Sequence, residues 1–344
     1  MKRIAPLFTL LLAIAPASAQ DTAGEVTPLF ASDEILELTL SGPIREIVAR
    51  GEKSTDPHPA TLSAAGESHA IQLSARGNSR RLKELCRFPP LRVRFEAKPG
   101  GASLFHRQSG IKLVTHCRDS DSAEQTMLRE YAAYRLYNVL TPESFRVRLA
   151  RVSYRDGERE YARRLAFFIE DGDDAARRLG LEELDIGDTP RTQVDREAAA
   201  RYALFQYMIG NTDWAMVLGP TKTDCCHNSR LFGANKEARS ALVPVPYDFD
   251  NSGLVDAGYA VPNPELGTYS VRTRVYRGFC SFNDLVPAAA ARMRALRGQF
   301  EASLAATPEA DAGTVAAMTK YLASFYEDIE DEETIGKKLL KKCR

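Results

Sequence analysis

The chain has 344 residues and a mass of 38.1 kDa, enough for one large domain or two smaller ones. Hydrophobic residues make up 44% and charged residues 27%, a balance that excludes general disorder. Basic and acidic residues both number 46, so the net charge gives no indication of binding to nucleic acid, and we expect no nucleic-acid partner.

The N-terminus has the pattern of a cleavable secretory signal. Lys2 and Arg3 precede an apolar run over 7–15, and Ala17-Ser18-Ala19 supplies the small residues of a cleavage site. We expect residues 1–19 to be removed on export to the periplasm or the exterior, which leaves 44 basic and 46 acidic residues. The alternative is an uncleaved anchor, although this run is shorter than the ~20 residues that span a bilayer. No later segment approaches that length, so we expect no integral span after cleavage.

All six cysteines lie beyond this signal. An even number in an exported chain favours disulfides, but the sequence does not choose among the possible pairings. The alternative is a metal site, although Cys225-Cys226-His227 is contiguous, whereas structural zinc sites usually space paired cysteines two residues apart. The cysteines are Cys86, Cys117, Cys225, Cys226, Cys280 and Cys343.

The first half of the chain is rich in strand patterns. Apolar and polar residues alternate over 35–40, 70–74 and 91–95, and 111–114 is a further short strand. Turn-forming residues over 75–79 follow the second of these strands at a hairpin position.

A helix is expected over 122–140, capped by Ser122 and with apolar residues along one face. Strands over 146–154 and 163–169 flank the turn at Asp156-Gly157.

From residue 171 the patterns predict helices, interrupted by a loop-rich stretch over 210–278. Strands first and helices afterwards predict an α+β fold in two parts, 25–170 and 171–344. We expect helices over 173–179, 194–209, 284–304 and 312–329, and short strands over 229–232 and 241–245.

Polar residues follow or precede apolar segments at three places in this second part. Asp213 follows the longer helix, Asn228 precedes a short strand, and Asp248 and Asp250 end the next one. In phosphoryl transfer one carboxylate orients the attacking hydroxyl, while an amide and a carboxylate hold Mg²⁺ on the phosphates. The pattern therefore indicates a phosphoryl-transfer site.

Several short motifs follow one another over 71–253. They are Arg76-Gly77-Asn78-Ser79, Met127-Leu128-Arg129-Glu130-Tyr131, Ala133-Tyr134-Arg135-Leu136, Gly210-Asn211-Thr212-Asp213, Asn228 and Tyr247-Asp248-Phe249-Asp250. In this order they resemble the CotH family, the spore-coat protein H kinases, which have an atypical protein-kinase fold. The resemblance implies a two-lobed, kinase-like fold, with a β-rich N-lobe containing one long helix, a mainly helical C-lobe and ATP between them.

The resemblance also implies roles for the matching residues. Asp213 corresponds to the catalytic aspartate, Asn228 and Asp248 correspond to the Mg²⁺ ligands, and Asp250 assists them. The turn from Arg76 to Ser79 covers the ATP phosphates with its backbone N–H groups.

Lys112 is the candidate for the lysine that pairs with the phosphates. Glu130 on the following helix is its expected carboxylate partner, and Glu124 is the second choice. Both are assigned from their places relative to this strand and helix.

The expected protein is a secreted CotH-like kinase that uses Mg²⁺ to transfer the γ-phosphoryl group of ATP to a serine or threonine hydroxyl of a protein. The alternative is a catalytically inactive envelope or binding protein that keeps the kinase fold. Two features motivate it. From Asp213 to Asn228 is 15 positions, whereas about five separate these roles in protein kinases. An exported chain also meets little ATP.

A calcium loop starting at Asp248 is another reading, with Asp250, Ser252 and Gly253 at the next matching positions. It would place Tyr259 where a bidentate glutamate is required. The histidines have neither ligand spacing nor a serine elbow beside them, so a hydrolase triad is disfavoured. The sequence does not indicate the oligomeric state.

Overall fold

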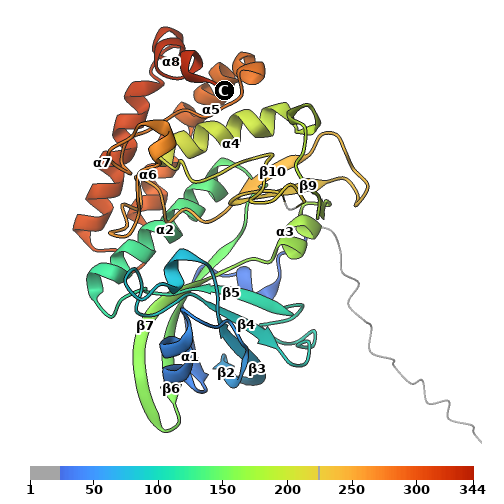
Figure 1. Cartoon of the computed structure of the whole chain (residues 1–344), viewed down its shortest axis with the longest axis vertical. Coiled ribbons are helices and arrows are strands. Elements are labelled where there is room, and N and C mark those ends of the chain that lie inside the picture. Colours follow the sequence, from blue (N-terminus) through green and yellow to red (C-terminus); the bar gives the residue numbers. More distant parts are fainter. Residues whose placement is uncertain (1–23, 224) are drawn as a thin grey trace, which may run out of the picture.

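A computed structural model describes residues 24–223 and 225–344, so the signal expected at 1–19 lies outside the described residues. Strands of the first half close into a barrel in the order β1-β2-β3-β4-β5-β7-β6 (Figure 1). These strands are β1 (Leu36–Ser41), β2 (His58–Ala64), β3 (Glu67–Ala75), β4 (Leu91–Phe95), β5 (Gly110–Val114), β6 (Val147–Asp156) and β7 (Arg159–Ile169). Neighbouring strands are antiparallel except β1 and β6, which are parallel.

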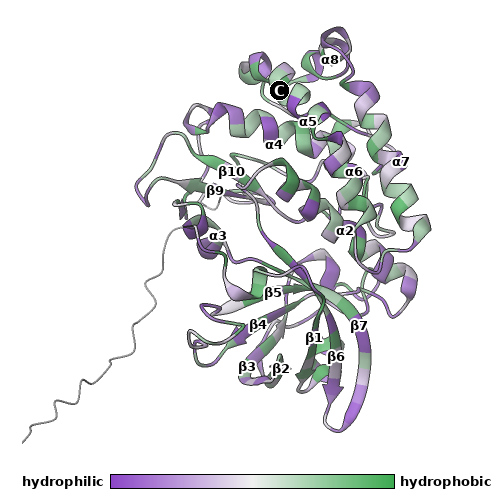
Figure 2. Ribbon diagram, turned by 180° about the vertical axis from the view of Figure 1, so that it is seen from behind, coloured by the Kyte–Doolittle hydropathy of each residue, from purple (hydrophilic) through white to green (hydrophobic). Residues whose placement is uncertain are grey.

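The alternation in the sequence decides which residues fill the barrel. Leu73, Val93 and Ile111 pair across β3, β4 and β5 and are at most 1% exposed. Because successive side chains of a strand point to opposite faces, the neighbouring pair Arg92 and Lys112 lies on the outer face. Figure 2 shows hydrophobic and hydrophilic residues alternating along the barrel strands.

Helices make up most of the second half, and the long helix α2 (Asp121–Leu140) lies between them and the barrel, packed on β7 (Figure 1). A small sheet is formed by β8 (Glu182–Glu183), β9 (Ser229–Gly233) and β10 (Val243–Pro246). The other helices are α1 (Ile44–Arg50), α3 (Gly172–Arg178), α4 (Arg196–Ile209), α5 (Val286–Ala295), α6 (Arg297–Ala305), α7 (Ala312–Asp328) and α8 (Glu332–Lys338).

The expected α+β class is confirmed, and three local expectations need correction. Ser120 rather than Ser122 caps α2, because its hydroxyl accepts the Ala123 N–H. The segment expected as one helix over 284–304 is two helices, α5 and α6, which meet at Leu296.

The third correction concerns the residues after β3. The connection from β3 to β4 spans residues 76–90 and contains a 3₁₀ turn at Ser79–Arg81, so it is not a tight hairpin turn. This longer connection carries Arg80 into the interior of the protein, where it is 8% exposed.

All the cysteines are paired within the described part of the chain, as Cys86–Cys117, Cys225–Cys226 and Cys280–Cys343. Disulfides persist in oxidising compartments, so this pairing is compatible with an exported protein. Among the described residues, no helix combines the length and the apolar character that crossing a membrane requires.

The Cys280–Cys343 disulfide gives the first testable prediction. It joins residues 63 positions apart and fastens the C-terminal end of the chain to the start of the helical segment before α5. Because a cross-link restricts the unfolded chain more as its loop lengthens, we expect the double change to serine to lower the free energy of unfolding by about 2–4 kcal/mol. Urea denaturation of both proteins measures this difference.

The matched control is the double change of Cys225 and Cys226 to serine. This disulfide joins residues one position apart and closes almost no loop, so its removal should cost much less. Equal losses in the two variants would contradict the expectation.

Candidate functional site

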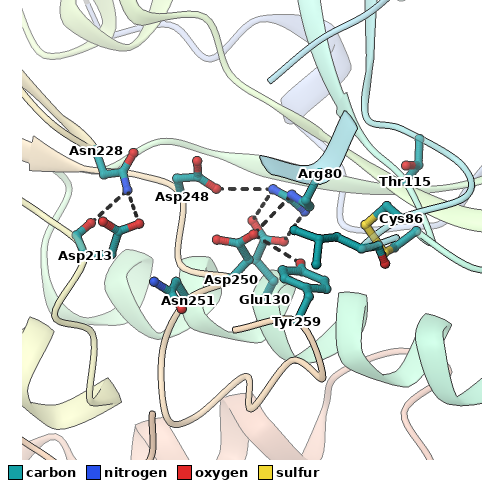
Figure 3. Close-up of polar contacts among 12 residues, drawn as sticks. Arg80, Cys86, Thr115, Glu130, Asp213, Asn228, Asp248, Asp250, Asn251 and Tyr259 are labelled. Atoms are coloured by element: carbon teal, nitrogen blue, oxygen red, sulfur yellow. Dashed lines mark hydrogen bonds and ion pairs between the residues drawn. A yellow bond between two sulfur atoms is a disulfide. The ribbon is translucent and has the colours of Figure 1, made fainter. Parts of the chain in front are cut away.

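One buried arginine gathers three carboxylates between the barrel and α2 (Figure 3). Arg80 donates from Nη1 to Glu130 Oε2 at 3.0 Å and from Nη2 to Asp248 Oδ1 at 3.2 Å. Its Nε lies 3.1 Å from Asp250 Oδ2. Tyr259 donates its hydroxyl to the same Asp250 oxygen at 3.1 Å. We call Arg80, Glu130, Asp248 and Asp250 the arginine cluster.

Charge in the arginine cluster is unbalanced, because one guanidinium faces three carboxyl groups. Burial, followed by the charges of Asp250 and Asp248, raises the pKa of Glu130 despite the attraction of Arg80. Burial also raises the pKa of Asp250. Although burial opposes it, the carboxylates hold the pKa of Arg80 well above its ordinary value. The cluster therefore has a surplus of negative charge, which protons or a further cation can offset.

Asp248 and Asp250 follow β10 on an irregular segment of backbone. Asp248 has a φ of +62°, which is uncommon for a residue other than glycine. Its N–H donates to the Tyr134 hydroxyl of α2 at 2.9 Å, and the buried Phe249 ring packs 4.6 Å from the Tyr134 ring. These contacts hold the strained turn in place and direct Asp248 and Asp250 towards Arg80.

The segment that carries Asp213 begins where α4 ends. Gly210 ends the helix with a φ of +67°, and a Cβ there would lie 2.0 Å from the Tyr321 hydroxyl. The side chain of Asn211 then accepts the Asp213 N–H at 2.9 Å. The sequence therefore permits a sharp turn at this point, and the turn presents the Asp213 carboxylate beside Asn228.

Asp213 and Asn228 bind each other. Asn228 donates its Nδ2 to the backbone oxygen of Asp213 at 2.8 Å and to Oδ2 at 3.2 Å. The half-exposed His227 places Nε2 2.7 Å from Asp213 Oδ1. Although burial opposes it, the hydrogen bond from His227 lowers the pKa of Asp213, and Asp213 raises the pKa of His227. Asp213 is therefore held as a carboxylate.

Asp213, Asn228 and Asp248 are brought to one place, although they are far apart in the sequence (Figure 3). Because the Nδ2 of Asn228 is directed at Asp213, its amide oxygen points away from Asp213. Arg80 contacts Oδ1 of Asp248, and no contact within the described part of the chain engages Oδ2. Two oxygen atoms, of the kind that hard cations bind, are thus available on neighbouring side chains.

The expected pair of Lys112 and Glu130 is not formed, since Glu130 is bound by Arg80. The ammonium of Lys112 lies 4.8 Å from the centre of the Tyr247 ring. Burial, with the neighbouring charges of Arg76 and Arg230, lowers the pKa of Lys112 to about 8. The half-buried Lys112 thus lies against Tyr247, while an arginine from the 76–90 connection takes the place beside Glu130.

Glu124, the second choice, is not in the site. It accepts the Leu165 N–H at 2.6 Å and lies 3.4 Å from Arg164, near the start of α2, whereas Asp248 contacts Tyr134 further along the helix. The turn formed by Gly77, Asn78 and Ser79 is exposed and directly precedes Arg80, and Gly77 has a φ of +86°.

Two alternative metal sites were considered from the sequence, one at Cys225-Cys226-His227 and one in the loop that starts at Asp248. In both, the residues concerned make other contacts within the protein. Cys225 and Cys226 form a disulfide with each other, and His227 is bound to Asp213, so these residues do not form a shared ligand set. In the calcium-loop reading, Tyr259 stands where a glutamate is required, and its hydroxyl donates to Asp250. No group of three or more histidine, cysteine, aspartate or glutamate side chains within 24–223 and 225–344 is arranged to hold a metal ion alone.

Comparison with models of known protein families finds no match, and comparison with curated proteins finds none either. The function of the site is therefore argued from its geometry.

The contacts of three residues with the carboxylates of the site could not be predicted from the sequence. These residues are Arg80, His227 and Tyr259. Arg80 directly follows the motif ending at Ser79, but Arg81 beside it is an equal candidate in the sequence, and only the 3₁₀ turn decides which one points inward. Tyr259 and His227 have no local pattern that connects them to a carboxylate.

Arg80 gives the second prediction. Changing Arg80 to methionine would leave the buried carboxyl groups of Glu130 and Asp250 without their cation, and removing one partner of a buried ion pair costs about 3–5 kcal/mol. We expect the free energy of unfolding at neutral pH to fall by about that amount, measured by urea denaturation.

The matched control changes the neighbouring Arg81 to methionine. Within the described residues, Arg81 donates to the backbone oxygens of Gly77 and Gly51 and to no carboxylate, so a far smaller loss is expected. If the Arg80 variant were as stable as the Arg81 variant, the three carboxyl groups would not depend on the guanidinium.

Proposed function

We propose that the protein is an exported, two-lobed CotH-like kinase that transfers the γ-phosphoryl group of ATP to a serine or threonine hydroxyl of a protein. The observation that carries this proposal is the convergence of Asp213, Asn228 and Asp248, which come from three separate segments. Phosphoryl transfer needs a carboxylate for the hydroxyl and oxygen ligands for a metal. Export is supported by the disulfides and the N-terminal pattern.

The donor atoms of the site fit Mg²⁺. This ion prefers oxygen ligands and is usually held by one or two carboxylates together with the phosphates of the substrate. Asn228 and Asp248 would hold it through their side-chain oxygens, and Asp250 would add negative charge beside them. When bound, the ion neutralises charge on the phosphates. The surplus negative charge of the arginine cluster is consistent with a cation binding there.

The residues of the chain have distinct tasks in the transfer. Asp213 accepts the proton of the attacking hydroxyl, and His227 and Asn228 hold the Asp213 carboxylate in position. The bond between the γ-phosphorus and the bridging oxygen breaks, a new bond joins that phosphorus to the hydroxyl oxygen, and ADP leaves. Lys112 supplies positive charge for the phosphates from the barrel side.

A second candidate is an inactive protein that keeps the binding site. The specific observation in its favour is that Arg80 already contacts both Asp248 and Asp250, the carboxylates that an active kinase needs for its metal. Such a protein would bind Mg²⁺-ATP, and thus gain stability from it, without transferring phosphate. Saturable binding of ATP without phosphorylation of any protein would favour it.

The third prediction tests the transfer itself. Changing Asp248 to asparagine removes the charge that would face the metal, and we expect phosphorylation from labelled Mg²⁺-ATP to fall by about 100-fold or more. Incorporation of label into the protein or an added protein substrate measures this, with circular dichroism to show that the variant is folded.

The control is the same change at Asp185, an exposed aspartate, which should leave labelling unchanged. Equal labelling of the unmodified protein and the Asp248 variant would remove Asp248 from the mechanism.

The fourth prediction concerns the pH dependence of ATP binding. A lysine is charged below its pKa, and the pKa of Lys112 is lowered to about 8 by burial and by the charges of Arg76, Arg230 and Arg92, against the attraction of Asp171. Affinity for Mg²⁺-ATP should therefore weaken as the pH rises through about 8, where an ordinary lysine would still be charged.

Calorimetric titration on either side of this pH measures the change, with methionine at position 112 as the comparison. The variant should bind more weakly and show little pH dependence in this range. A wild-type affinity that stays constant through this range would exclude contact between Lys112 and the phosphates.

A further inference from the structure

A cavity of about 300 Å³ lies on the outer face of β3 and β4, at the edge of the proposed site. We call it the basic groove. Its walls are Gln72 and Ser74 of β3, which pair with Arg94 and Arg92 of β4, and Arg76 closes the end where β3 stops. Among the described residues that line it there are three arginines and no carboxylate.

No carboxylate forms an ion pair with the arginines of the basic groove among the described residues. Within the described part of the chain, no hydrogen bond or ion pair engages the side chains of Arg76, Arg92 or Arg94. Arg92 also stands directly opposite Lys112 on the neighbouring strand, and like charges in this position destabilise a sheet. An arrangement that costs stability is expected where a ligand supplies the missing charge.

The basic groove is linked to the proposed site through Arg92 and Lys112, which pair on neighbouring strands. Arg92 of the groove stands opposite Lys112, and the ammonium of Lys112 lies 4.8 Å from the centre of the ring of Tyr247, the residue before Asp248. Lys112 feels Arg76, Arg92 and also Arg230, which lies over the same Tyr247 ring. Positive charge thus extends outward from the place where phosphates would meet the metal.

We propose that the basic groove binds a linear chain of phosphates, so that the site accepts polyphosphate as its phosphate donor. Guanidinium groups match phosphate oxygens with two parallel hydrogen bonds, and Arg92 and Arg94 on one face of β4, with Arg76 after the end of β3, fit a repeating anion. This inference rests on the proposed function, since it names the donor used by the same site.

The transfer from polyphosphate balances in the same way as transfer from ATP. The hydroxyl oxygen forms a bond to the terminal phosphorus, the bond from that phosphorus to the bridging oxygen breaks, and the hydroxyl proton moves to Asp213. The products are a phosphorylated protein and a chain shorter by one phosphate. No oxidant or further reactant is needed.

The test compares binding of long-chain inorganic polyphosphate, ATP and poly-glutamate to the full chain by calorimetry. We expect polyphosphate to bind more tightly than either of the others. Changing Arg92 and Arg94 together to glutamine should weaken its binding by about tenfold or more, because two charged donors to the phosphates are lost. The control changes Arg159 and Arg163, two exposed arginines of β7 in the same barrel, and should bind as the unmodified protein does.

Three results would overturn the proposal: unchanged polyphosphate affinity in the Arg92 and Arg94 variant, an equal loss in the control, or poly-glutamate that binds as tightly and competes. The last would make the groove a site for acidic peptides.

A separate measurement of phosphoryl transfer distinguishes a failure of this inference from a failure of the proposed function. Labelling from ATP that requires Asp248, without polyphosphate binding, would end this inference and leave the kinase standing. Binding of polyphosphate that requires Arg92 and Arg94, without transfer of phosphate from any donor, would support binding in the basic groove and contradict the proposed kinase activity.

Discussion

The interaction on which the architecture depends is the contact of one guanidinium with three carboxyl groups. Arg80 comes from the connection between two barrel strands, Glu130 from α2, and Asp248 and Asp250 from the loop after β10. Three segments are thereby fixed to one point, and the bond from the Asp248 N–H to the Tyr134 hydroxyl joins two of them as well. A buried ion pair gains little over a hydrophobic contact, but breaking it is costly, so it selects one arrangement over its competitors.

Negative and positive charges lie in different places around Arg80. The arginine cluster has more carboxyl groups than cations, whereas the outer face of β4 and β5 carries the cations Arg92 and Lys112 side by side. A ligand that combines a divalent cation with several phosphates would offset both imbalances at once. The same polarity would disfavour a simple anion near Asp248 and a simple cation near Arg92. The charge distribution therefore favours the same class of ligand as the geometry of Asp213 and Asn228.

Much of the fold could be predicted because its signals are local. The alternation over 91–95 and the Asp156-Gly157 turn predict β4 and the β6–β7 hairpin, and both are present. The partners of the site could not be predicted in this way. Arg80 and Lys112 are both cations close to α2 in the chain, and only the path of the 76–90 connection and the pleat of β5 decide which one meets Glu130. Local periodicity contains no information on that choice.

The long spacing between Asp213 and Asn228, which argued against a kinase in the sequence, has a structural explanation. The Ala215 N–H donates to the His227 oxygen at 2.9 Å, and the His227 N–H donates to the Leu218 oxygen at 3.1 Å. These bonds close the ends of the segment between Asp213 and Asn228 on each other, so the chain leaves the site and returns to it. Asn228 is positioned by its bonds to Asp213 and by a φ of +51° at the start of β9, and neither depends on how many residues lie between. The insertion therefore does not count against catalysis.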